Sequence, residues 1–295
     1  MKDAARLVVY CVATLLLGAC LAPLLFWLAQ WLAAHRVLVF LASYDFENFF
    51  HRTLLLSAVV LLWPLLRSAR VRQRRDLGIA PNEHWMRDLC FGFLIAAAPL
   101  LCCALLLVQL DVYSWRSAVP WKAVSGVALA AVTVPIIEEM LFRGLFLGLL
   151  LRSASRLWSI IIVSAFFSIL HFLKPPDSSI ATEAVRWNSG FVSAADAFGQ
   201  FSDPLLVLAG FTTLFLLGCI LADARVQTRS LWLPIGLHAG WILVSGIFNK
   251  IAHREVLALP WLGKNLLVGI VPLTIALASW ALVRGWLKYV GPRET

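Results

Sequence analysis

Residues 124–143 read VSGVALAAVTVPIIEEMLFR, and this stretch decides both the fold class and the place to look for chemistry. No charge occurs from Val124 to Ile137, and then Glu138, Glu139 and Arg143 follow. Ionisable groups at membrane depth are costly, so such a group indicates a functional site. On a helix, Glu139 and Arg143 are four residues apart and can pair, whereas Glu138 points about 100° away. We therefore expect one structural carboxylate and one that is available for proton chemistry.

The composition of the whole chain is that of a membrane protein. Of its 295 residues, 61% are hydrophobic and only 14% are charged, and the mean hydropathy is +0.85. These values predict an all-α fold, a polytopic transmembrane helical bundle. The formal net charge of +9 does not indicate a nucleic-acid partner, because the basic residues lie mainly between the apolar segments.

Hydropathy predicts about eight transmembrane helices. Their expected ranges are 7–33, 53–67, 89–110, 121–148, 157–173, 204–222, 231–248 and 264–286. The loop after the second helix carries the densest basic cluster, Arg67, Arg70, Arg72, Arg74 and Arg75. The positive-inside rule places this loop in the cytoplasm. Alternation then places both termini there, together with the loops around Arg152 and Arg156 and around Arg225 and Arg229.

The longest polar stretch outside the predicted helices is 174–203. We expect an extramembrane loop there, with an interfacial helix near 190–200. The sequence is accordingly divided into N-terminal transmembrane helices (1–120), a core that contains this loop as an insertion (121–250), and a C-terminal helix and tail (251–295).

Two histidines lie within apolar segments. His171 follows Phe167 by four residues, so the two rings share a helix face, and His238 lies in the apolar stretch 232–241. A packed, hydrogen-bonded residue is one interpretation of each histidine. However, polar groups in a membrane bundle face inward and find one another. Neutral imidazoles can hold a metal or a water molecule, and a nearby carboxylate can take the proton of that water.

The predicted helix ranges place two of the candidate residues at different depths in the membrane, which conflicts with a single site. They place Glu138 toward the cytoplasmic half of its helix and His171 toward the opposite side of the membrane. Strong tilts or shifted helix ends are needed to bring the two side chains together. Pro135 is expected to loosen the helix just before Glu138.

Taken in order, three short patterns resemble a known family. The patterns are Glu138-Glu139 followed by Arg143, Phe167 followed by His171, and His238 in a later helix. They resemble the CPBP family of intramembrane metalloproteases, which includes CAAX prenyl endopeptidases of the Rce1 type and bacterial relatives often labelled Abi. The resemblance covers about 120–250.

The resemblance implies a role for each of these residues. Glu138 resembles the general base that activates water, and Glu139 with Arg143 resembles a structural pair. His171 and His238 resemble the residues that hold this water or a divalent metal. The metal interpretation implies Zn²⁺ or another divalent ion on Glu138, His171 and His238. A glutamate-activated water without metal is the other interpretation, and a metal on Glu138 would occupy the group that is needed as base.

One position departs from the family pattern. The family usually has Asn or Asp four residues after the last histidine, where it is thought to help to bind the oxyanion, and this chain has Ile242. Isoleucine cannot donate a hydrogen bond. We expect the indole N–H of Trp241 or a backbone N–H to supply the donor, because Ser245 and Asn249 lie about 10 Å and 16 Å from His238 along the helix.

Three functions are compatible with these patterns. The leading one is an intramembrane endopeptidase in the lipid bilayer that cleaves membrane-anchored peptides or proteins. The second is a non-catalytic scaffold or bacteriocin-immunity factor of the same fold, which Ile242 favours. The third is a proton-coupled transporter, which the lack of an internal repeat disfavours. The expected location is the bacterial inner (plasma) membrane, as a multi-pass protein.

Overall fold

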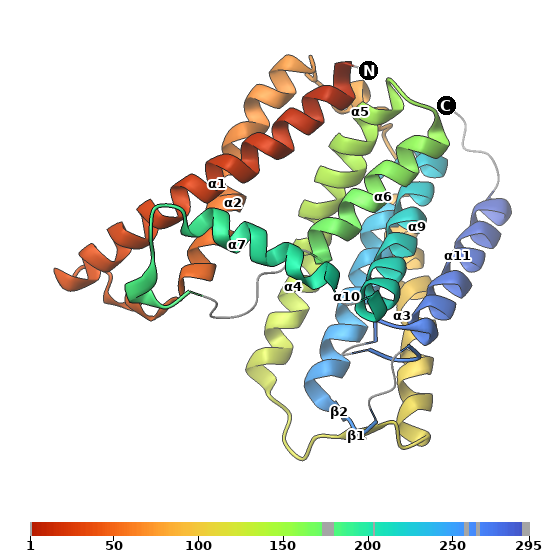
Figure 1. Cartoon of the computed structure of the whole chain (residues 1–295). Coiled ribbons are helices and arrows are strands. Elements are labelled where there is room, and N and C mark those ends of the chain that lie inside the picture. The colour runs from red at the N-terminus through yellow and green to blue at the C-terminus, as the bar shows by residue number, and fades with distance from the viewer. Residues whose placement is uncertain (1, 173–179, 203, 257–259, 264–265, 291–295) are drawn as a thin grey trace. The chain divides into compact units, whose positions relative to one another are not determined.

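The computed structural model describes residues 2–172, 180–202, 204–256, 260–263 and 266–290 (Figure 1). The chain divides into two compact units. The first comprises residues 1–72 and 173–203, and the second comprises 73–172 and 204–295. These units are defined by packing and differ from the three regions that the sequence predicts, 1–120, 121–250 and 251–295. The three-region division stays a prediction.

The first unit contains two long helices and one short helix. Its elements are α1 (Lys2–Ala34), η1 (Val39–Ser43), α2 (Phe46–Ser68), η4 (Thr182–Ala184), α7 (Ser189–Phe198) and η5 (Gly199–Ser202). Phe26 of α1 packs edge-on against Phe46 and Phe49 of α2. Helix α7 lies close to α1 at Gly190, where a Cβ atom would stand only 2.1 Å from the carbonyl oxygen of Ala19. It forms within the predicted extramembrane loop, at the place where the sequence predicts an interfacial helix.

The second unit contains the remaining elements. They are η2 (Arg74–Leu77), α3 (Trp85–Gln109), β1 (Tyr113–Trp115), α4 (Trp121–Glu139), η3 (Met140–Phe146), α5 (Leu147–Leu151), α6 (Arg156–Phe172), α8 (Pro204–Leu206), η6 (Val207–Phe211), α9 (Thr212–Thr228), α10 (Trp232–Ile251), β2 (Ala252–Arg254) and α11 (Ile270–Val290). Helix α10 packs against α3, α4 and α9. Strands β1 and β2 pair antiparallel, with Ser114 opposite His253.

Glycines allow the backbones of α3 and α10 to approach closely. A Cβ atom on Gly236 would lie 2.2 Å from the carbonyl oxygen of Leu89, and one on Gly240 would lie 2.6 Å from that of Phe93. Helices in lipid associate through such small residues, because burial of apolar surface does not drive contacts between lipid-exposed helices. This packing fixes the helix that carries His238.

The helices confirm the predicted fold class. In the described part of the chain, seven helical segments are long and apolar enough to cross a membrane, and α6 is a shorter apolar helix. Each overlaps one of the eight predicted ranges; residues 264 and 265 of the last range lie outside the described residues. The chain is therefore an integral, multi-pass membrane protein. Its orientation in the membrane stays a prediction.

Candidate active site

A π-helical segment follows directly after the two glutamates. Helix α4 ends at Glu139, and η3 continues the same span as a π-helix up to Phe146. Such segments are rare and occur often at functional sites. Pro135 lies within α4, which is α-helical up to Glu139, so the helix loosens after the two glutamates and not before Glu138 as the sequence predicts. Arg143 lies within this segment, and its side chain and that of Glu139 are both fully buried.

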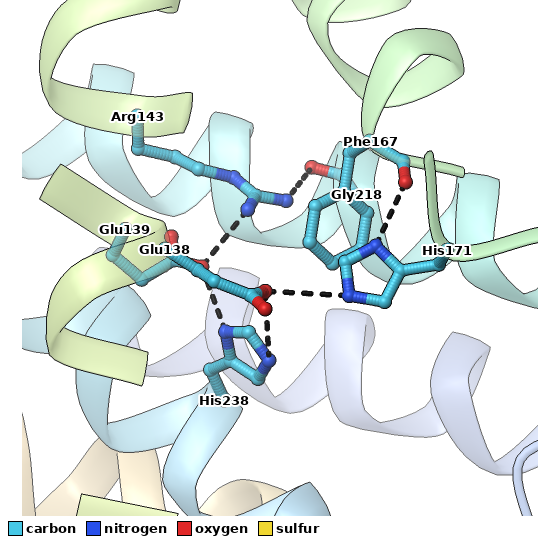
Figure 2. Close-up of polar contacts among 7 residues, drawn as sticks. All are labelled: Glu138, Glu139, Arg143, Phe167, His171, Gly218 and His238. Atoms are coloured by element: carbon cyan, nitrogen blue, oxygen red, sulfur yellow. Dashed lines mark hydrogen bonds and ion pairs between the residues drawn. The ribbon is translucent and has the colours of Figure 1, made fainter. Parts of the chain in front are cut away.

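Glu139 and Arg143 form the ion pair that their spacing predicts. Arg143 Nη1 donates to Glu139 Oε1 at 2.9 Å, and Nη2 donates to the carbonyl oxygen of Gly218 in α9 at 3.4 Å (Figure 2). The guanidinium also lies over the ring of Phe167, 4.3 Å from its centroid. A buried charge is tolerated when it is paired and hydrogen-bonded, and these contacts meet both conditions.

Both histidines are oriented by a hydrogen bond at Nδ1. His238 Nδ1 lies 2.9 Å from Glu139 Oε1, and His171 Nδ1 lies 2.8 Å from the carbonyl oxygen of Phe167 (Figure 2). Carbonyl and carboxylate oxygens accept hydrogen bonds, so each Nδ1 carries the proton. In a neutral imidazole the Nε2 atom then has a free lone pair.

The two Nε2 atoms converge on Glu138. Glu138 Oε2 lies 3.3 Å from His171 Nε2 and 3.8 Å from His238 Nε2. This oxygen is buried and accepts no hydrogen bond from the described part of the chain. Three lone-pair atoms therefore face one point, an arrangement that favours a proton, a water molecule or a cation among them. Glu138 Oε2 itself is buried, whereas the side chains of Glu138 and His171 as a whole are 24% and 31% exposed.

The expected separation of Glu138 and His171 in depth is wrong. The span that contains Glu138 runs to Leu151, further than predicted, and α6 begins at Arg156 after a short turn. At about 1.5 Å per residue, Glu138 lies about 20 Å along its helix from Leu151, and His171 lies about 22 Å along α6 from Arg156. The two helices form a hairpin whose arms carry both side chains to the same depth.

The donor types at this point fit a divalent metal in part. A carboxylate oxygen and two imidazole nitrogens are common zinc ligands, and Glu139 on the far side of His238 is the outer carboxylate that often orients such a ligand. However, no group of three or more His, Cys, Asp or Glu side chains among the described residues is arranged as a metal site. Metal binding by Glu138, His171 and His238 stays a prediction.

The expected oxyanion donor is placed in an apolar environment. Trp241 belongs to a buried cluster with residues of α3, α9 and α11, such as Leu100, Leu217 and Ala276. Ser245 Oγ donates to the carbonyl oxygen of Trp241 at 2.6 Å. The donor that replaces Asn at Ile242 therefore stays open.

Two residues of the site were not found from the sequence. Gly218 supplies the carbonyl that Arg143 contacts, and a Cβ atom there would meet Ser164 of α6 at 2.9 Å. The sequence predicts a cytoplasmic loop around Arg225, but Arg225 lies within α9 and is buried. Its Nε donates to the carbonyl oxygen of Arg143 at 3.1 Å, and its Nη2 donates to that of Leu77. Neither contact has a signal in the sequence, because both involve backbone atoms.

The comparison with protein families agrees with the site. Residues 120–244 match the model of the Rce1-like family, described as type II CAAX prenyl endopeptidase Rce1-like. This region is similar to the Rce1-like family. The matched residues include all five side chains of the cluster, so the Rce1-like region is the part of the chain that carries the candidate site. No curated protein and no solved structure matches the chain.

Proposed function

We propose that this protein is an intramembrane endopeptidase of the CAAX type, with Glu138 as the general base. The observation that carries the proposal is the convergence of two imidazole Nε2 atoms on Glu138 Oε2, at 3.3 and 3.8 Å. A base must lie within hydrogen-bond reach of the proton that it takes, and a water molecule at this point would be within reach of all three groups.

The chemistry follows from the hydrogen-bond roles. Glu138 accepts a proton from the water while an Nε2 lone pair accepts the second O–H, which aims the oxygen away from the cluster. The oxygen attacks the scissile carbonyl carbon, and the C–N bond breaks as Glu138 returns its proton to the leaving amine. Glu139 takes no proton: it holds His238 in the tautomer that presents Nε2, and Arg143 holds Glu139.

A divalent metal, when bound, would be held by His171, His238 and Glu138, and it would polarise the scissile carbonyl or the water. The Glu139 carboxylate would then fix the orientation of the ligand His238. Proton transfer by Glu138 does not depend on such an ion.

The substrate is a peptide or protein that is itself anchored in the membrane. Glu138 and Arg143 lie within the span from Trp121 to Leu151, and His238 lies within that from Trp232 to Ile251. Hydrocarbon contains no water, so a hydrolytic site at this depth has to open toward an aqueous side. The partial exposure of the Glu138 and His171 side chains is compatible with an opening at this place.

The test is cleavage of a panel of membrane-tethered peptides by the full chain in detergent. Glu138→Gln keeps the shape of the side chain and should lower turnover by about 10² or more, since general-base catalysis contributes roughly that factor. Glu83→Gln, at an exposed glutamate before α3, is the matched control and should cleave at the wild-type rate. Wild-type turnover in Glu138→Gln would exclude this base.

The second candidate is a membrane scaffold or immunity factor that keeps the fold without catalysis. Ile242 favours it, because the position where the family has a donor is apolar here. In cells, Glu138→Gln would then leave the phenotype of the wild-type protein intact while the variant inserts and folds normally.

A further inference from the structure

A second polar cluster is formed by side chains of α6, α9 and α11 in the second unit. Asp223 of α9 is almost fully buried, accepts hydrogen bonds from Arg156 Nη2 at 2.9 Å and Trp280 Nε1 at 3.0 Å, and forms an ion pair with Arg284 Nε at 2.9 Å. With its amide oxygen turned toward the guanidiniums, Gln227 accepts from Arg284 Nη1 at 3.1 Å and from Arg156 Nη2 at 2.8 Å. One carboxylate thus faces two guanidiniums, which leaves an excess of one positive charge.

The excess charge is available to a ligand. Each guanidinium has five N–H donors, more than Asp223 and Gln227 together can satisfy for both. The side chains of Arg156 and Arg284 are 48% and 49% exposed, whereas that of Asp223 is 5% exposed. The negative partner is therefore covered, and the positive groups face outward.

An apolar cleft continues from this cluster along the helices. It has a volume of about 600 Å³, which lies in the range of small-molecule sites. Helices α6 and α11 both pack on α9, and the cleft lies between them with α9 as its floor. Its lining comprises the polar cluster and the side chains of Leu157, Ile160, Ile161, Phe215 and Cys219.

The cleft changes from polar to apolar in one direction. Phe215, Cys219, Asp223 and Gln227 are spaced by four residues, so they form one stripe along α9. The stripe runs about 18 Å from the charged end to the apolar end. Arg156 begins α6 and Arg284 lies in the last turns of α11, so the charged end coincides with the ends of all three helices. This is the end that we predict to be cytoplasmic.

We propose that this cleft binds one anionic phospholipid of the cytoplasmic leaflet. The phosphate group lies on the free donors of Arg156 and Arg284, and an acyl chain lies along the apolar stripe between α6 and α11. Arginine suits this role because its planar fork of donors matches phosphate oxygens. A free phosphate ion would use the charged end alone and would leave the apolar length of the cleft empty.

The test is native mass spectrometry of the full chain in detergent with dioleoyl-phosphatidylglycerol or dioleoyl-phosphatidylcholine. We expect the first lipid to bind with a preference of about fivefold or more for phosphatidylglycerol, the factor that one basic residue near a membrane surface contributes. Arg156→Gln and Arg284→Gln, made singly so that Asp223 keeps one guanidinium, should each bring the preference close to one. Ile161→Trp fills the cleft and should lower retention of both lipids.

Two control variants distinguish a specific lipid site from general surface charge. Arg75→Gln removes an exposed arginine from the basic loop and should keep the preference, and Arg156→Lys keeps the charge and should retain most of it. If neither Arg156→Gln nor Arg284→Gln changes the preference, the arginines only tie α6 and α11 to α9 and the proposal is wrong. If Arg75→Gln lowers the preference for phosphatidylglycerol as much as the other two variants do, the preference comes from general surface charge and the proposal is also wrong.

Discussion

The buried pair of Glu139 and Arg143 gives the strongest stability prediction. Both side chains are fully buried, and Glu139 Oε1 accepts from Arg143 and from His238 at 2.9 Å each. Arg143→Met removes one partner and leaves the carboxylate with a neutral imidazole as its remaining donor. Loss of one partner of a buried pair costs about 3–5 kcal/mol, so the unfolding equilibrium constant should rise by roughly 10² to 10⁴.

The double variant Glu139→Gln with Arg143→Met should be more stable than Arg143→Met alone. It carries no unpaired charge, and the amide oxygen of Gln can still accept from His238 Nδ1. Replacing a buried pair by neutral groups of similar volume is often close to neutral in stability. We therefore expect a coupling energy of about 2 kcal/mol or more between the two positions, which is large for neighbouring residues.

The assay is equilibrium unfolding in mixed micelles with increasing denaturing detergent, for the wild type, both single variants and the double variant. Arg6→Met is the matched control, because Arg6 forms an i,i+3 pair with Asp3 and is 36% exposed. Asp3 is buried, so this pair is only partly exposed; since exposed pairs contribute about 0–1 kcal/mol, we expect its loss to cost less than that of the fully buried pair. The reasoning is refuted if the two single effects add within about 0.5 kcal/mol, or if Arg143→Met costs no more than Arg6→Met.

Three further predictions concern the metal, the oxyanion donor and helix packing. If the histidines hold a metal, chelation should stop cleavage, and elemental analysis should give near one metal per chain, falling in His171→Ala; full activity in a metal-free preparation would exclude this. Ile242→Asn should raise turnover by up to roughly 10² to 10³ if the donor role is vacant, and Trp241→Phe should lower it by a similar factor if the indole is the donor. The measurement is the turnover of both variants in steady-state kinetics; if neither substitution changes it, a backbone N–H is the donor. Gly236→Ala should destabilise the fold by about 1–3 kcal/mol, because the new Cβ meets a backbone oxygen at 2.2 Å; Gly126→Ala, with open space around it, should be neutral or stabilising in the same unfolding assay.

Hydropathy was sufficient to predict the helices but not how they meet. Each predicted range overlaps a helix because an apolar run of the right length has one stable form in lipid. The spacing of Glu139 and Arg143 likewise predicted their pair. The π-helical segment after Glu139 has no hydropathy signal, since hydropathy does not depend on whether a helix is α or π.

The depth of His171 could not be predicted because it depends on where two helices turn. An error of three residues at the end of the span, from 148 to Leu151, shifts Glu138 by about 4.5 Å relative to the turn. The position of His238 depends on backbone contacts between α3 and α10, which Gly236 and Gly240 allow. Glycines reveal that a close approach is possible, but the sequence does not say which helix approaches.

The charges of the cluster explain why one carboxylate can act as base in a buried place. If both histidines are neutral, Glu138, Glu139 and Arg143 carry a net charge of −1. Transfer of a proton from water to Glu138 moves the negative charge onto the hydroxide that forms, so the total charge of the site stays at −1 while Glu139 remains paired with Arg143. Without Arg143 the charge would be −2, and Glu139 itself would compete for the proton. A divalent metal would make the charge +1 and use Glu138 as a ligand. In the mechanism that we propose, Glu139 and Arg143 therefore hold His238, and Glu138 stays available to activate water.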